Sequence, residues 1–235
     1  MGQAGTWIAH AHEDRRAGRV TLRRVLVENG LSLTLGTLFL IALGGQAWAG
    51  HHAYNQEQRE HGAAPVSFAG YLLTGHFVAA TAENWESEFL QMAAFVWLTS
   101  FLFQKGSPES RDPYDPNEDE RPVTARSPWP VRRGGPWLKL YENSLSLAFL
   151  LLFLGSFALH VASGAAQHSS EQMQHGGQAV SWREYLSTSR LWYESLQNWQ
   201  SEFLAIASML VLSIYLRQRG SPESKAVQTP HAHNE

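Results

Sequence analysis

An internal duplication constrains the fold of this chain more than any other feature of its sequence. The motif Asn-Trp-x-Ser-Glu-Phe-Leu occurs at residues 84–90 and again at residues 198–204. Each copy opens an apolar run, and each run is followed by a Gly-Ser-Pro-Glu-Ser stop. A single register aligns residues 28–111 with residues 142–225 without a gap, so the sequence predicts two related halves of one fold.

Apolar residues are concentrated in a few runs, although the mean hydropathy of the whole chain is only -0.26. The runs at residues 31–49 and 145–166 are long enough to cross a bilayer core, which takes about 20 residues. The runs at residues 89–103 and 203–216 are shorter, so their spans must reach back into the duplicated motif. We therefore expect an all-α membrane protein with four transmembrane helices arranged as two tandem hairpins. Because the first run recurs inside the chain, we expect it to be a span and not a signal peptide.

A stripe of aromatic and apolar residues precedes each of the two shorter runs. Its members recur at spacings of three, four and seven, which places them on one helix face. They are Phe68, Tyr71, Val78, Ala82, Trp85 and Phe89, then Trp182, Tyr185, Trp192, Leu196, Trp199 and Phe203. This pattern predicts an interfacial amphipathic helix in each half, leading into the shorter span. Gly106 and Gly220 are expected to cap the ends of these spans.

The polar segments set the expected domain boundaries and the orientation. We expect a basic leader at 1–27, a first membrane repeat at 28–111, a charged, proline-rich linker at 112–137, a second repeat at 138–225 and a polar tail at 226–235. Lys and Arg are concentrated in the leader, the linker and the tail. The positive-inside rule therefore predicts that both termini and the linker are cytoplasmic.

The duplicated motif supplies the main candidate site. The patch consists of Asn84, Trp85, Ser87, Glu88, Asn198, Trp199, Ser201 and Glu202. In each copy the Asn, Ser and Glu share one helix face, since they lie at positions i, i+3 and i+4. An ionisable residue at membrane depth is a functional hypothesis by default, and Glu88 and Glu202 together would suit a proton or a cation. The alternative is that both glutamates are ordinary interfacial and helix-start residues.

A second set of charges lies at the opposite ends of the predicted spans. Glu28 and Glu142 open the first and third spans, whereas Lys105 and Arg219 close the second and fourth. We expect one ion pair in each half at the inner boundary and interpret both pairs as structural.

Metal and other chemistry are weakly indicated. The chain has no cysteine, which excludes disulfides, thiolate metal sites and cysteine nucleophiles. The histidines expected outside are His51, His52, His61, His76, His160, His168 and His175. With the glutamates they would form a metal site, or His160 would bind haem, but only His61 and His175 recur between the halves. The sequence leaves the cofactor undetermined, and it carries no phosphate-binding loop and no nucleic-acid footprint.

The duplicated motif, its apolar span and the Lys/Arg-Gly-Ser-Pro-Glu-Ser stop resemble a family of uncharacterised bacterial membrane proteins that carry them twice. The resemblance covers residues 28–111 and 142–225. The resemblance implies a bacterial inner-membrane protein that contains a domain of unknown function. It identifies no catalytic residue.

Three classes of function remain open at this point. The first is a structural or accessory membrane subunit, embedded in the lipid bilayer, that binds another subunit or a second copy of itself. The second is a small proton or cation transporter or channel that uses Glu88 and Glu202. The third is a membrane enzyme with a metal or haem. We favour the first class, and a protein that is not an enzyme, because nothing beyond one polar patch requires chemistry.

Overall fold

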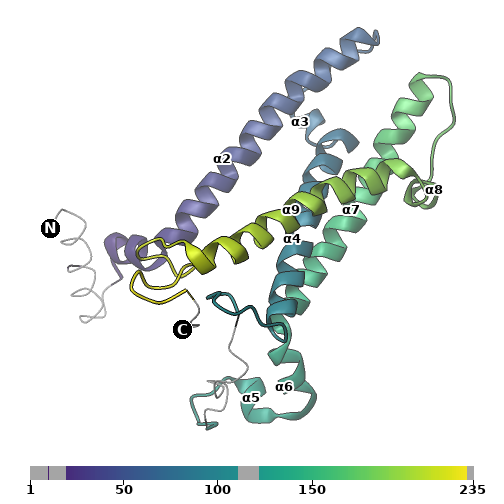
Figure 1. Ribbon diagram of the computed structural model, residues 1–235. Helices are drawn as coiled ribbons and strands as arrows, with labels where there is room; N and C mark the ends of the chain where they lie inside the picture. The colour runs from purple at the N-terminus through teal and green to yellow at the C-terminus, as the bar shows by residue number, and fades with distance from the viewer. Residues whose placement is uncertain (1–9, 11–19, 111–121, 232–235) are drawn as a thin grey trace. The chain divides into compact units, whose positions relative to one another are not determined.

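The computed structural model describes His10, residues 20–110 and residues 122–231, and its regular structure there is entirely helical (Figure 1). Most of the predicted leader, the acidic part of the linker and the last residues of the tail lie outside these ranges. The chain divides into two units, Met1–Leu72 and Leu73–Glu235, so the boundary falls inside the first predicted repeat.

The first unit is built on one long helix, α2 (Leu22–Glu60, 39 residues). It begins at Thr21, whose side chain accepts a hydrogen bond from the backbone N–H of Arg24 at 3.3 Å. This N-cap satisfies one of the backbone donors that a helix start leaves without a partner. The helix therefore starts within the predicted leader and continues well beyond the first apolar run.

The chain turns back after α2 to a short helix, α3 (Phe68–Tyr71). The Asn55 side chain fixes this return, since Oδ1 accepts from the N–H of Val66 at 2.7 Å and Nδ2 donates to its carbonyl at 2.9 Å. Tyr71 is buried against Gly50, where an added Cβ atom would clash with the tyrosine oxygen. The C-terminal end of α2 is thus tied to α3 by one polar side chain and one close packing contact.

The second unit contains α4 (Gly75–Thr99), α5 (Trp129–Arg133), α6 (Gly135–Glu142), α7 (Ser144–Gln174), α8 (Trp182–Leu186) and α9 (Ser189–Tyr215). Helix α4 packs along α7 and also against α9 (Figure 1). Thr74 and Thr188 cap the starts of α4 and α9 through their side-chain oxygens. Part of the predicted linker is therefore helical, because α5 and α6 lie between residues 129 and 142.

The second unit repeats the local contacts of the first at the end of its own long helix. Ser169 Oγ donates to the carbonyl of Val180 at 2.8 Å and accepts from its N–H, also at 2.8 Å. Tyr185 is buried against Gly164, as Tyr71 is against Gly50. These positions correspond one to one in the alignment of the two sequence copies. Similar sequence therefore produces a similar connection between the long helix and the short one.

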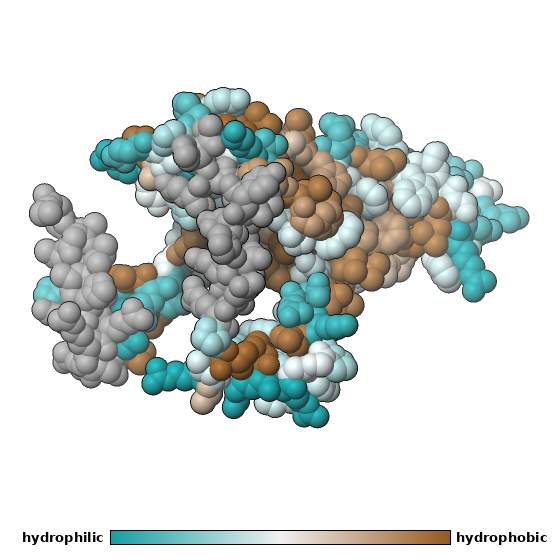
Figure 2. All heavy atoms as spheres, turned by 60° about the horizontal axis from the view of Figure 1, so that its bottom comes forward, coloured by the Kyte–Doolittle hydropathy of each residue, from teal (hydrophilic) through white to brown (hydrophobic). Residues whose placement is uncertain are grey.

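Two of the described helices, α2 and α7, are long and apolar enough to cross a membrane. None of the most apolar stretch of α2 is buried, and 17% of that of α7 is, whereas the core helix of a soluble protein is mostly buried. Figure 2 shows hydrophobic side chains spread over much of the visible surface. Among the described residues, more polar than apolar side chains are buried. This distribution is the one that a lipid surrounding favours.

The predicted interfacial helices differ from what is observed. Each stripe is interrupted, at residues 72–74 in the first half and 187–188 in the second, and the rest of the stripe forms the beginning of α4 or α9. The interruption occurs because Thr74 and Thr188 start new helices with their side-chain caps, so the pieces before them are only four and five residues long. Spacing alone could not reveal that break.

The predicted C-caps at Gly106 and Gly220 are also wrong. Helix α4 ends at Thr99 and α9 at Tyr215, several residues before either glycine. The two glycines have φ values of 87° and 83° and belong to separate turns over residues 104–110 and 218–224. A positive φ explains why glycine occupies both positions, but in a turn and not at a helix end.

Candidate functional site

The most deeply buried polar cluster joins three helices of the second unit. His160 lies near the middle of α7 and is 1% exposed, while Glu86 on α4 and Ser195 on α9 are 0% exposed. His160 Nδ1 lies 3.1 Å from Glu86 Oε2, and Ser195 Oγ donates to Glu86 Oε1 at 2.7 Å. Both oxygens of the buried carboxylate therefore have a partner, as a buried charge requires.

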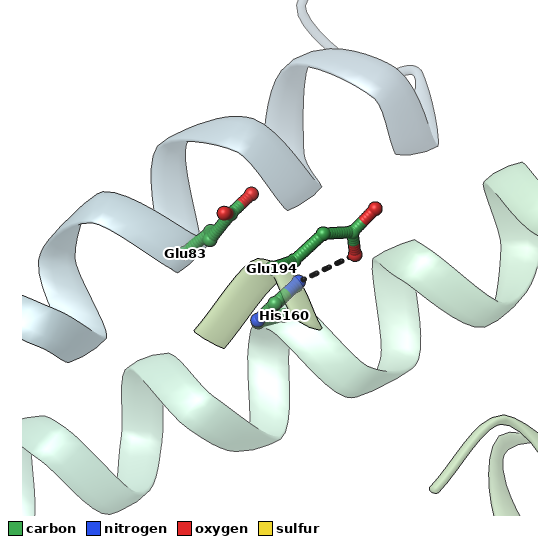
Figure 3. Close-up of side chains that lie close together, drawn as sticks. All are labelled: Glu83, His160 and Glu194. Atoms are coloured by element: carbon green, nitrogen blue, oxygen red, sulfur yellow. Dashed lines mark ion pairs between the residues drawn. The ribbon is translucent and has the colours of Figure 1, made fainter. Parts of the chain in front are cut away.

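Two further carboxylates lie near the imidazole. His160 Nε2 lies 3.6 Å from Glu194 Oε2, and Glu83 on α4 lies nearby (Figure 3). One ligand atom from each of Glu83, His160 and Glu194 lies within 4.8 Å of the other two. The imidazole thus has the buried Glu86 on its Nδ1 side and the partly buried Glu194 on its Nε2 side, with Glu83 close to both His160 and Glu194.

Each outer carboxylate is held by neutral or cationic donors. Asn198 Nδ2 donates to Glu83 Oε1 at 2.6 Å. The Tyr185 hydroxyl donates to Glu194 Oε2 at 2.9 Å, and Arg190 Nε donates to Glu194 Oε1 at 2.9 Å. These contacts hold the two carboxylates in place, with Glu83 bonded across the interface between α4 and α9.

Arg190 continues the cluster toward the exposed end of α7. Its guanidinium forms an ion pair with Glu171, and its Nη1 also lies 3.2 Å from His168 Nδ1. Glu171 in turn accepts a hydrogen bond from Gln167 at 2.9 Å. A continuous series of polar side chains therefore leads from the buried Glu86 to the partly exposed groups near the C-terminal end of α7.

The arrangement as a whole carries an excess of negative charge. The cluster contains four carboxylates, from Glu83, Glu86, Glu171 and Glu194, and one guanidinium, that of Arg190, which pairs with Glu171 and Glu194. Carboxylates held near one another away from water attract a cation, whether a proton or a metal ion. The cluster is therefore suited to binding positive charge next to His160.

The comparisons with known proteins place the chain in a family. The family described as Domain of unknown function (DUF6766) matches residues 22–235, which is nearly the whole chain. The chain belongs to the DUF6766 family. This confirms the resemblance to a domain without an assigned function. No curated protein and no solved structure matches.

In this DUF6766 member the predicted patch is only partly buried. In the first copy of the motif Ser87 is buried and donates to the carbonyl of Asn84, whereas Asn84 and Glu88 are exposed, as is Trp85. In the second copy Asn198 reaches Glu83, the ring of Trp199 lies edge-on to Phe153, and Ser201 is exposed. Most of the patch therefore lies outside the buried cluster, and Asn198 joins the two.

Glu88 and Glu202 do lie within range of each other's charge. Glu202 is partly buried, and its backbone carbonyl accepts a hydrogen bond from Gln91 Nε2 at 3.1 Å. The two glutamates bring two negative charges together on α4 and α9, but no histidine joins them there among the described contacts.

The other predicted residues lie at the helix ends. Glu28 forms an ion pair with Arg24, one turn earlier in the same helix, and the remaining members of the predicted inner pairs, Lys105, Glu142 and Arg219, are exposed. His61 and His175 are exposed residues at the ends of α2 and α7, and His61 Nδ1 bonds to the carbonyl of Glu57. Each of these two histidines thus sits where its own long helix ends.

Sequence reasoning missed Glu86, the variable residue of the duplicated motif. Because the second copy has Gln200 there, the position looked free to vary. Glu86 could have been found from His160, an ionisable residue in the middle of the most apolar helix. Such a residue needs a charged partner from another helix. A second sequence feature that points to Glu86 is Glu83, which lies one helical turn away on the same face of α4.

Proposed function

We propose that this chain is an integral membrane protein that binds a cation inside its helices, as a small proton or cation transporter does. The observation that carries the proposal is the Glu86–His160–Ser195 cluster, buried between helices whose outer surfaces are apolar. An unpaired buried charge costs several kcal/mol, so a cluster with excess carboxylates is stable only with a cation close by. Compared with the sequence-based hypothesis, the binding role moves from Glu88 and Glu202 to Glu86 and its neighbours.

The proposal includes four membrane crossings, by α2, α4, α7 and α9. Helices α4 and α9 contain 25 and 27 residues, which is about 38 and 40 Å at 1.5 Å per residue. Both lengths exceed the roughly 30 Å of a hydrocarbon core. The distribution of Lys and Arg supports an inner-membrane protein with both termini and the linker in the cytoplasm.

The proposal is tested by flux into liposomes that contain the purified full-length chain. A pH-sensitive dye and a divalent-metal dye, each trapped inside, report proton and metal entry under an imposed membrane potential. We expect flux above that of empty liposomes, and we expect Glu86→Gln to abolish it because the buried charge is lost. Glu57→Gln, a change of an exposed glutamate at the end of α2, serves as the matched control. Equal flux with and without folded protein would contradict the transport function.

A second function, that of a partner-binding subunit, is favoured by the part of the patch that remains exposed. Asn84, Trp85 and Glu88 leave polar surface on a long helix that otherwise carries many apolar side chains. Another subunit or a second copy would cover that surface. Native mass spectrometry from nanodiscs tests this function, which predicts an oligomer that Glu88→Gln weakens. A monomer at all protein concentrations, for the wild type and the variant alike, would contradict it.

A further inference from the structure

We infer that the cation is a divalent transition-metal ion held by Glu83, Glu194 and the Nε2 atom of His160. This inference rests on the proposed cation site and specifies its ligand. The three residues come from α4, α9 and α7, and their side chains lie close together (Figure 3). The site therefore exists only where three helices meet, so an ion there would bind the three helices together.

The spacing of the ligand atoms is close to what a small ion needs. One atom from each residue lies within 4.8 Å of the other two. Metal–ligand distances of about 2.0–2.2 Å place neighbouring ligand atoms roughly 3–4 Å apart. A contraction of about 1 Å would therefore bring the three ligand atoms to the spacing that an ion requires.

The partners of His160 match those of a metal-binding histidine. Such a histidine nearly always donates its second ring N–H to a carboxylate, a backbone carbonyl or a water, which fixes the tautomer and orients the ring toward the metal. Here Nδ1 faces Glu86 at 3.1 Å, and Glu86 is itself fixed by Ser195 at 2.7 Å. Nδ1 then carries the hydrogen, and the lone pair of Nε2, which lies 3.6 Å from Glu194 Oε2, is available to an ion.

The two carboxylates are also oriented from behind. Asn198 donates to Glu83, and both Tyr185 and Arg190 donate to Glu194. A carboxylate has about four lone-pair positions, so each of these groups keeps room for an ion. Ligands that are held in place before the ion arrives lose less conformational entropy on binding it.

The ligand chemistry selects the class of metal. An imidazole favours transition metals such as Zn²⁺ and Fe²⁺ over Mg²⁺ and Ca²⁺, which prefer ligand sets made only of oxygen. Two carboxylates supply the two negative charges that a divalent ion neutralises. With no cysteine in the chain, copper(I) and other thiolate-seeking ions have no sulfur ligand except methionine.

Only one of the two sequence copies carries the ligands. The register of the duplication places Gln46 opposite His160, Ala80 opposite Glu194 and Gln197 opposite Glu83. Neither an amide nor a methyl group replaces an imidazole or a carboxylate as a metal ligand. The inference therefore specifies one ion per chain, not two.

The test is equilibrium binding of Zn²⁺ and Co²⁺ to the purified full-length chain in nanodiscs. Calorimetry gives the stoichiometry for Zn²⁺, and the visible absorption of Co²⁺ reports nitrogen and oxygen ligands. We expect one ion per chain, a loss of about 10–100-fold in affinity for Glu86→Gln, and a larger loss for Glu83→Gln and Glu194→Gln. The control Glu57→Gln keeps the wild-type affinity.

Metal binding by the wild-type protein tests the inference even if a variant does not fold. If the folded wild type binds neither ion, or if Glu83→Gln and Glu194→Gln bind as the wild type does, the inference is overturned. If the protein binds no metal but shows proton flux that depends on Glu86, the proposed transport function stands and the metal ion is rejected as its cation. In that case the cation next to His160 is a proton.

Discussion

At the scale of single residues, Gly164 leaves the space that the ring of Tyr185 occupies. A Cβ atom at Gly164 would lie 2.7 Å from two atoms of that side chain, which is buried and bonded to Glu194. We predict that Gly164→Ala lowers the free energy of unfolding, since overpacking costs about 1–3 kcal/mol against a gain of about 1 kcal/mol in helix propensity. Thermal unfolding in detergent measures the change.

Gly155→Ala is the matched control for that prediction. Gly155 lies in the same helix, and nothing lies within 4 Å of a Cβ atom placed there. The control should be neutral or stabilising, because it gains helix propensity without a clash. If the two substitutions shifted the melting temperature equally, the packing of Tyr185 on α7 would be contradicted.

Ser195 tests whether Glu86 is buried and bonded to its hydroxyl. We predict that Ser195→Ala destabilises the protein by about 1–3 kcal/mol, because Glu86 Oε1 loses its donor where water cannot replace it. Ser201→Ala is the control, since Ser201 is exposed and donates only to the carbonyl of Asn198 in its own helix. Unfolding titrations compare the two, and equal effects would argue against a buried Glu86.

At the scale of elements, the two Gly-Ser-Pro-Glu-Ser segments form the same turn. In each turn the last Ser accepts from the N–H of the first Gln at 2.9 Å and donates to its carbonyl at 3.1 Å. The two turns meet where Glu109 of one lies against Glu223 of the other. Burial, the hydrogen bond with Glu223 and the repulsion from it raise the pKa of Glu109 to about 7.

That contact predicts a pH dependence of stability. The folded chain holds the Glu109 proton more tightly than the unfolded chain, whose ordinary pKa is 4.5. The contribution to stability is therefore complete below about pH 4.5 and is lost as the pH rises through about 7. We predict that the melting temperature falls over this range and that Glu109→Gln removes most of the fall. A fall that persists unchanged in the variant would place its origin elsewhere.

Sequence patterns predicted the elements better than their ends. The apolar runs located the long helices, since hydrophobic length is a property of composition. The caps at Thr74 and Thr188 were missed because Thr-x-x followed by an apolar residue occurs in many places, and only tertiary packing selects which threonine starts a helix.

Of the cluster's members, the sequence candidates included His160 and Asn198 but not Glu83, Glu86 or Glu194. Duplication directed attention to residues that recur, such as Glu88 and Glu202, whereas the buried cluster is made of residues that differ between the copies, such as Glu86 and His160. Which residues of a helix face the neighbouring helix depends on the rotation of both helices, and one sequence does not specify that rotation. The contacts between Glu86, His160 and Ser195 are therefore visible only in the structure.

At the scale of the whole molecule, the proposed topology makes a sharp prediction. Single cysteines replace Ala63, Val123, Gln178 and Gln228, and no natural cysteine competes for the label. With four crossings, a membrane-impermeant maleimide added to intact cells labels positions 63 and 178, and it labels 123 and 228 only after the membrane is opened.

Two crossings by α2 and α7 alone predict a different pattern. Position 123 would then be labelled from outside and position 178 from inside, while 63 and 228 would be unchanged. The linker and the loop after α7 therefore separate the two topologies, and the other two positions control for expression and for intact cells. Outside labelling at position 123 would contradict the four-span proposal.

The central claim, a metal ion held beside His160, is tested most directly by an experimental structure of the protein with Zn²⁺, using anomalous scattering at the zinc edge. The account predicts one strong peak per chain, bounded by Glu83, His160 Nε2 and Glu194, with Nδ1 still bonded to Glu86. A peak elsewhere, or no peak and a direct hydrogen bond from His160 Nε2 to Glu194, would contradict a metal site and leave a charged histidine between two carboxylates.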